Sequence, residues 1–158
     1  MGAIIAYELA QKIYCIKAPL PRHIILSGCV PPDKFHLSNI DLSSDDQIKQ
    51  RILKMGGTPL QIVENPEFDS SFLPIIRADY LMLERYEFNK QEHLLSEDIS
   101  VLYSKNDDSV SIKDVLTWGG ITTGLTRYYE FEGNHFFLTE ESKMVIECIR
   151  QICRDCRD

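Results

Sequence analysis

The 158 residues are enough for one domain that buries most of its apolar surface. The composition, 44% hydrophobic and 26% charged, is that of an ordinary soluble globular domain. A formal charge of -7 argues against nucleic acid as a partner, because phosphate binding draws on clustered Lys and Arg. The apolar stretches are too short for a membrane span and no export signal opens the sequence, so we expect a cytoplasmic protein with no membrane partner.

Five cysteines, an odd number, argue against a disulfide framework in a protein without an export signal. Three of them cluster near the end of the sequence and suggest a zinc site, but neither a fourth cysteine nor a histidine stands at zinc spacing. We therefore expect no metal and no cofactor. The three- and four-residue steps instead predict one apolar face of a terminal helix, made of Val145, Cys148, Ile149, Ile152, Cys153 and Cys156.

Residues 1–10 predict a helix that is already under way, because Leu, Ile and small residues dominate and no N-cap precedes them. We therefore expect the sequence to begin inside a longer protein. Pro19 and Pro21 end this helix. The short apolar run 23–27, closed by Gly28, is typical of a buried parallel strand.

A helical region without strands is predicted from residue 30 to 97. Ser44 and Gln47 form a capping box before a helical run at 48–55, which a Gly-Gly pair terminates. We interpret 30–97 as a helical insertion within a single domain that covers residues 1–158. Helical spacing continues in the apolar residues Phe72, Leu73, Ile76, Tyr80, Leu83 and Tyr86.

Strands return after this region. The segment 99–104 predicts a second strand, a serine-capped helix is expected over 111–118, and 126–130 predicts a third strand. Thr139 is expected to cap a last helix over 140–153. Strands that alternate with helices indicate parallel βαβ units. The sequence therefore predicts an α/β fold with three parallel strands and flanking helices.

Two chemically useful groups follow neighbouring strands. The acidic pair Asp107-Asp108 comes after strand 99–104, and His135 comes after strand 126–130. The carboxyl ends of parallel strands line the functional crevice of such a sheet, so the carboxylate and the imidazole are expected to meet there. An aspartate that orients a general-base imidazole is half of a Ser-His-Asp triad, although structural roles for both residues remain open on this pattern alone. No comparable placement is found for the other histidines, His23, His36 and His93.

Several segments occur in the order of a known family. Met1-Gly2 and the helix after it are similar to the end of a nucleophile elbow, Gly-His-Ser-Met-Gly-Ala, which lifts a serine above the sheet. The other matches are Ser27-Gly28 with Pro31-Pro32, segment 42–57, segment 65–67, the Leu-Pro-x-x-Arg-Ala-Asp signature within 72–80, Trp118, and Gly-Asn-His-Phe-Phe-Leu at 133–138. On these residues the whole chain resembles the C-terminal part of a type II thioesterase of the α/β-hydrolase superfamily.

The resemblance implies roles for individual residues. His135 would be the general base and Asp107 its orienting partner. The family pattern Gly-x-x-Asp-Pro aligns with 104–108 but both its Gly and its Pro are replaced, so Asp108 is the alternative partner. In a full-length form the backbone N–H of Met1 would be one oxyanion-hole donor. The nucleophilic serine would stand just before Met1, so no nucleophile is expected in this chain and the chain alone should be inactive.

The resemblance also implies a function. Type II thioesterases hydrolyse acyl thioesters on the phosphopantetheine arm of carrier proteins, as editing enzymes of non-ribosomal peptide, polyketide or fatty-acid synthases. The expected partner is thus an acyl or peptidyl carrier protein, the functional form is expected to be a monomer, and segment 30–97 would be the lid over the acyl chain. The alternative is a non-catalytic truncated fragment or pseudoenzyme that at most binds a carrier protein. Codons for Gly-His-Ser upstream of Met1, in frame, would favour the enzyme.

Overall fold

The computed structural model describes residues 1–37, 40–89 and 93–156. It contains two compact units: a sheet unit, Met1–Lys34 with Asn89–Asp158, and a helical unit, Phe35–Phe88. The predicted insertion 30–97 and the predicted single domain 1–158 both contain residues outside the described ranges, namely 38–39, 90–92 and 157–158. The domain boundaries and the lid role therefore stay predictions.

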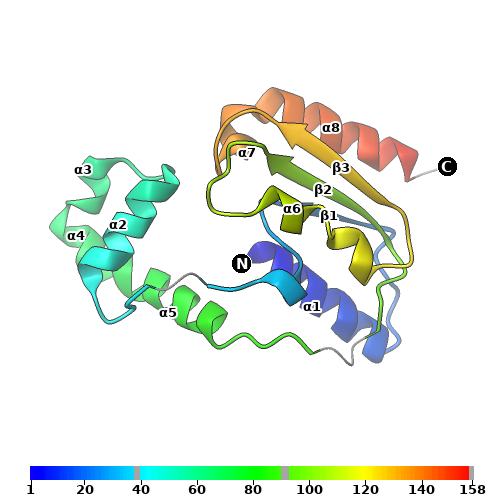
Figure 1. Ribbon diagram of the computed structural model, residues 1–158, viewed down its shortest axis with the longest axis horizontal. Helices are drawn as coiled ribbons and strands as arrows, with labels where there is room; N and C mark the ends of the chain where they lie inside the picture. Colours follow the sequence, from blue (N-terminus) through cyan, green and yellow to red (C-terminus); the bar gives the residue numbers. More distant parts are fainter. Residues whose placement is uncertain (38–39, 90–92, 157–158) are drawn as a thin grey trace. The chain divides into compact units, whose positions relative to one another are not determined.

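Three parallel strands form the sheet, in the order β1-β2-β3, with β1 at His23–Ser27, β2 at Asp98–Ser104 and β3 at Thr126–Phe131 (Figure 1). The predicted α/β fold with three parallel strands is confirmed. Both strand pairs are in parallel register, with His23 opposite Asp98 on β1 and β2. All three strands consequently end at the same edge of the sheet, and the loops that follow them gather there.

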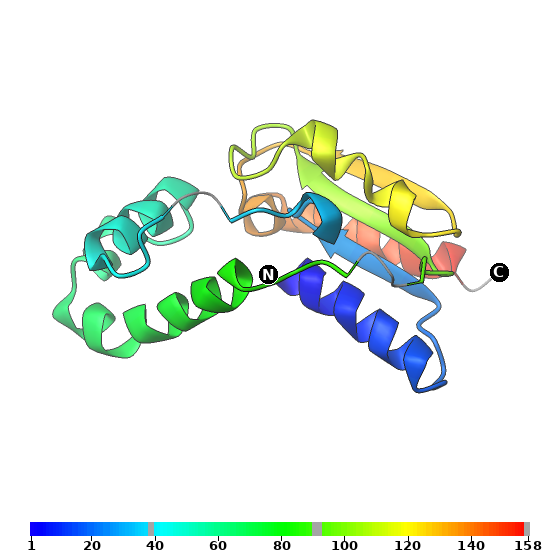
Figure 2. The same cartoon turned by 60° about the horizontal axis from the view of Figure 1, so that its bottom comes forward.

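Helices cover both faces of this sheet. Figures 1 and 2 show α8, Ser142–Asp155, along one face, with α6, Ile112–Val115, and the 3₁₀ helix η2, Trp118–Ile121, on the other. Alternate strand residues point to each face, and the apolar ones on this face, such as Leu102 and Phe131, pack with residues of α8. The core beneath α8 consists of Leu102, Phe131, Phe137, Val145 and Ile152.

The first helix, α1, runs from Gly2 to Cys15, which confirms the predicted helix and its end before Pro19. Met1 is its N-cap residue and provides no side-chain cap. The helix contacts β1, and its exposed side carries Ile5 and Leu9. Its amino end lies at the edge of the sheet where the strands end (Figures 1 and 2). The buried side chains of α1 are Ala3, Ile4, Tyr7, Ala10 and Gln11.

The described residues of the helical unit form four helices: α2 at Asp45–Met55, α3 at Leu60–Val63, α4 at Pro66–Ser71 and α5 at Leu73–Glu84. Half of the predicted capping box is present: the Ser44 side chain accepts a hydrogen bond from the backbone of Gln47, but Oε1 of Gln47 accepts from the Asp41 backbone rather than from that of Ser44. The short helices α3 and α4 each begin at a proline, Pro59 as the N-cap of α3 and Pro66 as the first residue of α4, where the missing N–H costs no hydrogen bond. The core of this unit is Leu42, Ile48, Ile52, Val63, Phe68 and Leu73.

The end of the chain differs from the prediction of one helix capped by Thr139. A separate turn, α7 at Phe137–Glu140, precedes α8, and Thr139 lies inside it. The side chain of Glu140 bonds back to Asn134, which closes this turn on itself. Glu141 then has φ -102° and ψ 31°, outside helical geometry, so α8 starts afresh after it.

The helix expected over 111–118 is also divided. Ser111 caps it as predicted, by accepting a hydrogen bond from the backbone of Asp114, but α6 ends at Val115. Gly119 and Gly120, which follow the expected helix, lie inside η2. Here Gly119 donates its N–H to the Tyr128 hydroxyl at 3.1 Å, so the backbone bonds to the neighbouring strand rather than to the preceding turn.

The predicted cysteine face of the last helix is only partly correct. Cys148 and Cys156 pack against the core beneath α8, whereas Cys153 is exposed. Each helical residue turns by about 100°, so Cys153 is displaced from the line that Cys148 and Ile152 share. All five cysteines are free. In the described ranges no three His, Cys, Asp or Glu side chains gather where they could hold a metal ion, and no helix there has the length and apolarity to cross a membrane.

Candidate active site

The structure brings Asp107 and His135 together at the edge where β2 and β3 end. Nδ1 of His135 lies 2.7 Å from Oδ2 of Asp107. The carboxylate is buried, with 1% of its side chain exposed, while 27% of the imidazole is exposed. Burial alone would raise the pKa of Asp107, but hydrogen bonds from His135 and Ser109 outweigh it and lower the pKa. Asp107 is therefore an ionised carboxylate held against an accessible imidazole. Asp108 is exposed.

Ser104, the last residue of β2, ties the two loops together. It is fully buried, and its hydroxyl donates to the carbonyl oxygen of Gly133 in the loop after β3. The same hydroxyl accepts from the backbone N–H of Asn106 at 3.2 Å. Asp107 in turn donates its N–H to the Ser104 carbonyl at 3.4 Å. One side chain thus fixes the start of the Asp107 loop relative to the turn that presents His135.

The turn before His135 depends on Gly133 and Asn134. Gly133 has φ +96°, and a Cβ there would lie 2.5 Å from Oε2 of Glu140. The Asn134 amide donates to Oε1 of Glu140 at 2.9 Å, and its side-chain oxygen accepts from the Phe136 backbone at 2.8 Å. The Asn134 side chain thus supplies two hydrogen bonds that a glycine at this position would lack. These contacts hold the backbone on both sides of the imidazole.

The turn after β1 packs against the same pair. Gly28 has φ +57°, which favours glycine, and a Cβ there would lie 3.4 Å from Cε1 of His135 and 3.8 Å from Oδ2 of Asp107. The next residue, Cys29, accepts a hydrogen bond at its carbonyl from the Trp118 indole at 2.8 Å. Trp118 is fully buried. The matched Ser-Gly and Trp positions therefore support the loop beside the imidazole.

The amino end of α1 lies close to this site. Burial raises the pKa of the Cys29 thiol, the positive charge of the Met1 amine lowers this pKa, and the negative charge of Asp107 raises it. The Met1 amine and the Asp107 carboxylate therefore both lie near Cys29. In the part of the chain that the structure describes, Nε2 of His135 has no hydrogen-bond partner. The imidazole is therefore held through Nδ1 and leaves Nε2 available for a proton. The oxyanion role of Met1 stays a prediction.

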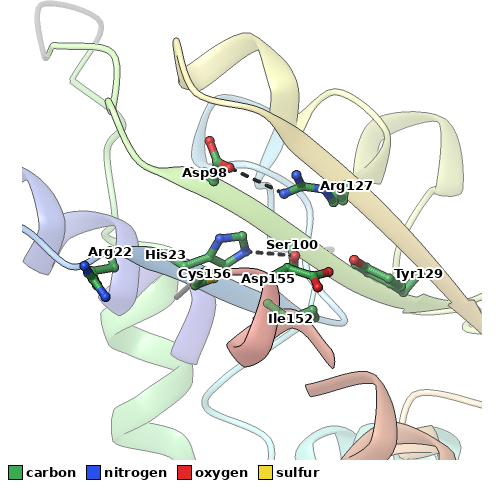
Figure 3. A pocket seen from close by; sticks show the side chains of 9 residues that line it. All are labelled: Arg22, His23, Asp98, Ser100, Arg127, Tyr129, Ile152, Asp155 and Cys156. Atoms are coloured by element: carbon green, nitrogen blue, oxygen red, sulfur yellow. Dashed lines mark hydrogen bonds and ion pairs between the residues drawn. The ribbon is translucent and has the colours of Figure 1, made fainter. Parts of the chain in front are cut away.

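A cavity of about 220 Å³ lies at the opposite end of the strands (Figure 3). Its polar side chains bond to each other: Nε2 of His23 lies 2.9 Å from the Ser100 hydroxyl, and Arg127 lies 3.4 Å from Asp98. Burial lowers the pKa of His23, while Asp98 raises it and Arg127 lowers it further. This cavity starts where the strands begin, so it is separate from the edge that carries His135.

Sequence reasoning missed three residues that build the site. Ser104 was noted only as a departure from the family pattern, and the contact of Gly28 with His135 depends on tertiary packing. Ser109 was not singled out, although Asp-x-Ser is a common turn in which a side chain bonds two residues onward. That spacing is the signal that could have found it.

Parallel strands flanked by helices, with an Asp–His pair after consecutive strands, define an α/β-hydrolase type of protein. Residues 1–153 match the model of the thioesterase domain family, and the chain belongs to this family. The family-level resemblance drawn from the sequence is thereby confirmed.

Similar proteins include type II thioesterases. The solved structure of ClbQ from the colibactin NRPS/PKS pathway has a TM-score of 0.88 at 30% identity, over 98% of this chain and 66% of ClbQ. The type II thioesterase BorB from the borrelidin biosynthetic cluster has a TM-score of 0.80 at 25% identity, over 94% of this chain and 60% of BorB. The chain is 27% identical to the probable anguibactin biosynthesis thioesterase AngT of Vibrio anguillarum, over 96% of this chain and 61% of AngT. It thus spans about three-fifths of such relatives.

Proposed function

We propose that this chain contributes the acid–base half of a serine thioesterase that hydrolyses acyl thioesters on phosphopantetheinyl carrier proteins. The observation that carries the proposal is the 2.7 Å contact between Nδ1 of His135 and the buried carboxylate of Asp107. An ionised aspartate on Nδ1 fixes the tautomer and stabilises the imidazolium that forms during the reaction. The base position, Nε2, then faces away from the aspartate.

In this mechanism a serine that this chain does not supply attacks the thioester carbonyl while His135 takes its proton at Nε2. The tetrahedral intermediate collapses, the carbon–sulfur bond breaks, and His135 returns the proton to the pantetheine thiolate. Water, deprotonated by His135, then attacks the acyl-serine; the bond from the acyl carbon to the serine oxygen breaks, His135 returns the proton to that oxygen, and a carboxylic acid leaves. The backbone N–H at Met1 would stabilise the oxyanion in both steps, because helix N-termini present unbonded N–H groups.

The names of the relatives support the choice of substrate. Among proteins similar to this chain are the gramicidin S biosynthesis protein GrsT of Aneurinibacillus migulanus, 30% identical, and the human medium-chain S-acyl fatty acid synthase thioesterase, 28% identical. We accordingly propose a carrier protein of a synthase as the partner, editing as the role, and a monomer as the functional form. The free cysteines favour a reducing compartment such as the cytoplasm.

We assign the lid over the acyl chain to the helical unit. Its core is closed by its own side chains, and exposed apolar residues lie at Phe72, the N-cap of α5, and at Ile75 and Met82 within this helix. Exposed apolar side chains on a self-contained helical unit suit contact with an acyl chain.

Hydrolysis of an acyl-N-acetylcysteamine thioester tests the proposal, with the 158-residue chain compared to a form extended by the codons upstream of Met1. The extended form should turn over and lose activity with His135→Ala, while the 158-residue chain should be inactive. An extended form that reads Gly-His-Ser yet stays inactive would favour the alternative, a pseudoenzyme that at most binds a carrier protein. Turnover by the 158-residue chain would overturn the assignment of the nucleophile.

A further inference from the structure

Ser109 contacts both members of the Asp107–His135 pair. Its backbone N–H donates to Oδ1 of Asp107 at 2.9 Å, and its hydroxyl oxygen lies 2.5 Å from the same carboxylate oxygen. The hydroxyl oxygen also lies 2.9 Å from Nδ1 of His135. Ser109 therefore hydrogen-bonds Oδ1 of Asp107, whereas His135 contacts Oδ2. The Ser109 hydroxyl and Asp107 both lie next to Nδ1 of His135.

The available hydrogen atoms fix the direction of these bonds. An ionised carboxylate only accepts, so the single hydroxyl hydrogen of Ser109 goes to Oδ1 of Asp107. The hydroxyl oxygen then presents lone pairs to Nδ1 of His135. All the contacts are satisfied only when Nδ1 carries a hydrogen, which it shares between Oδ2 of Asp107 and the Ser109 hydroxyl.

We propose that Ser109 is a positioning residue that, together with Asp107, holds a hydrogen on Nδ1 of His135 and leaves Nε2 as the base. The inference rests on the proposed function for the use to which Nε2 is put, but its geometry does not. Ser109 is exposed, so water competes for its hydroxyl. Removing the hydroxyl should therefore change the exchange rate of the Nδ1 hydrogen, and kcat in the extended protein, by about tenfold, which corresponds to one net hydrogen bond. Removing the carboxylate itself should have a larger effect.

The test is proton NMR of the 158-residue chain, which follows the Nδ1–H signal of His135 and its exchange with water. The signal is assigned by its absence in His135→Gln. In Ser109→Ala we expect exchange to become about tenfold faster, because one of two acceptors is lost. Ser109→Thr keeps the hydroxyl and should restore slow exchange. Ser111→Ala, which removes the cap hydroxyl of α6 in the same loop, is the matched control and should leave the signal unchanged.

Equal exchange in the wild type and in Ser109→Ala would overturn the inference, as would a Thr variant that exchanges as fast as the Ala variant. Loss of the signal in Ser111→Ala as well would show a general loosening of the loop and would also overturn it. None of these readouts needs turnover. The two proposals can fail separately. If Ser109→Ala speeds exchange of the Nδ1 hydrogen but the extended protein does not hydrolyse thioesters, the positioning role of Ser109 is supported and the proposed function is wrong.

In the extended protein the same variants should separate positioning from binding. Ser109→Ala should lower kcat about tenfold with KM unchanged, and Ser109→Thr should recover kcat. A rise in KM at constant kcat would instead assign Ser109 to substrate binding and contradict the positioning role.

Discussion

Oδ2 of Asp107 meets Nδ1 of His135 at 2.7 Å, and the loops that carry these residues follow two adjacent parallel strands. The contact is therefore a consequence of topology, since β2 and β3 end at the same edge and deliver both loops to one place. Ser104 at the end of β2 bonds the turn that precedes His135, so the two loops are also joined beneath the pair.

The lowered pKa of Asp107 predicts a pH dependence of stability. Burial raises this pKa, but bonds from His135 and Ser109 leave it lower than in the unfolded chain. The stabilising contribution is complete above the unfolded pKa of about 4 and is lost as the pH falls below it towards the folded pKa. In urea unfolding, the stability difference between wild type and Asp107→Asn should shrink below about pH 4. A difference that grows on acidification would contradict this, and exposed Asp108→Asn is the matched control.

Ser104→Ala should destabilise the sheet unit. The change removes the fully buried Ser104 hydroxyl and leaves the Gly133 carbonyl and the Asn106 N–H, both in part-buried hydrogen bonds, without their partner. We expect a loss of about 1–3 kcal/mol in the free energy of unfolding. The exposed hydroxyl of Thr117, which bonds the Asp114 carbonyl, offers a control whose removal should cost less than about 1 kcal/mol. If the two variants are equally stable, Ser104 does not join the loops in solution.

Two leucines of α5 should respond differently to truncation. Leu81 packs against the core of the helical unit, whereas Leu83, half-buried, is outside that described cluster. Leu81→Ala should therefore lower stability by about 1–2 kcal/mol. In the extended protein, Leu83→Ala should shift the acyl chain-length preference with little loss on a short substrate. Equal loss of kcat/KM on all chain lengths would mean that Leu83 is structural and that the lid assignment fails there.

Thiol labelling should divide the cysteines into classes. Cys15 and Cys153 are exposed and should react first, although Cys153 was predicted to lie on the apolar face of the last helix. Cys29 is buried and burial raises its pKa, as it does for Cys148, so little thiolate is available. Cys29 should label more than about tenfold more slowly than Cys153 at pH 8. Equal rates for the five thiols in the folded protein would contradict the packing described.

Much of this fold could be predicted because its signals are local. The run at 23–27 is short, apolar and bounded by turn residues, and Ser44 with Gln47 forms a cap that depends on four consecutive residues. The Asp107–His135 pair was also predictable, because parallel strands end at one edge and both residues follow strand ends.

The remainder depends on side-chain hydrogen bonds that form only once the loops are folded. Glu140 bonds to Asn134 and divides the last helix, which removes the predicted cap at Thr139. The Tyr128 hydroxyl bonds Gly119 and redirects the chain after α6. Neither bond has a signature in the local sequence, because each needs the folded arrangement of loop and strand. Helical geometry alone, in contrast, would have placed Cys153 off the apolar face.

The most direct test of the central claim compares Asp107→Asn with Asp108→Asn in the extended protein, on an acyl-N-acetylcysteamine thioester. If Asp107 orients His135, Asp107→Asn should lower kcat by roughly 10⁴ by leaving the imidazole in the wrong tautomer. Asp108→Asn, at an exposed neighbouring position, should retain nearly full activity. A larger loss in Asp108→Asn than in Asp107→Asn would contradict the account.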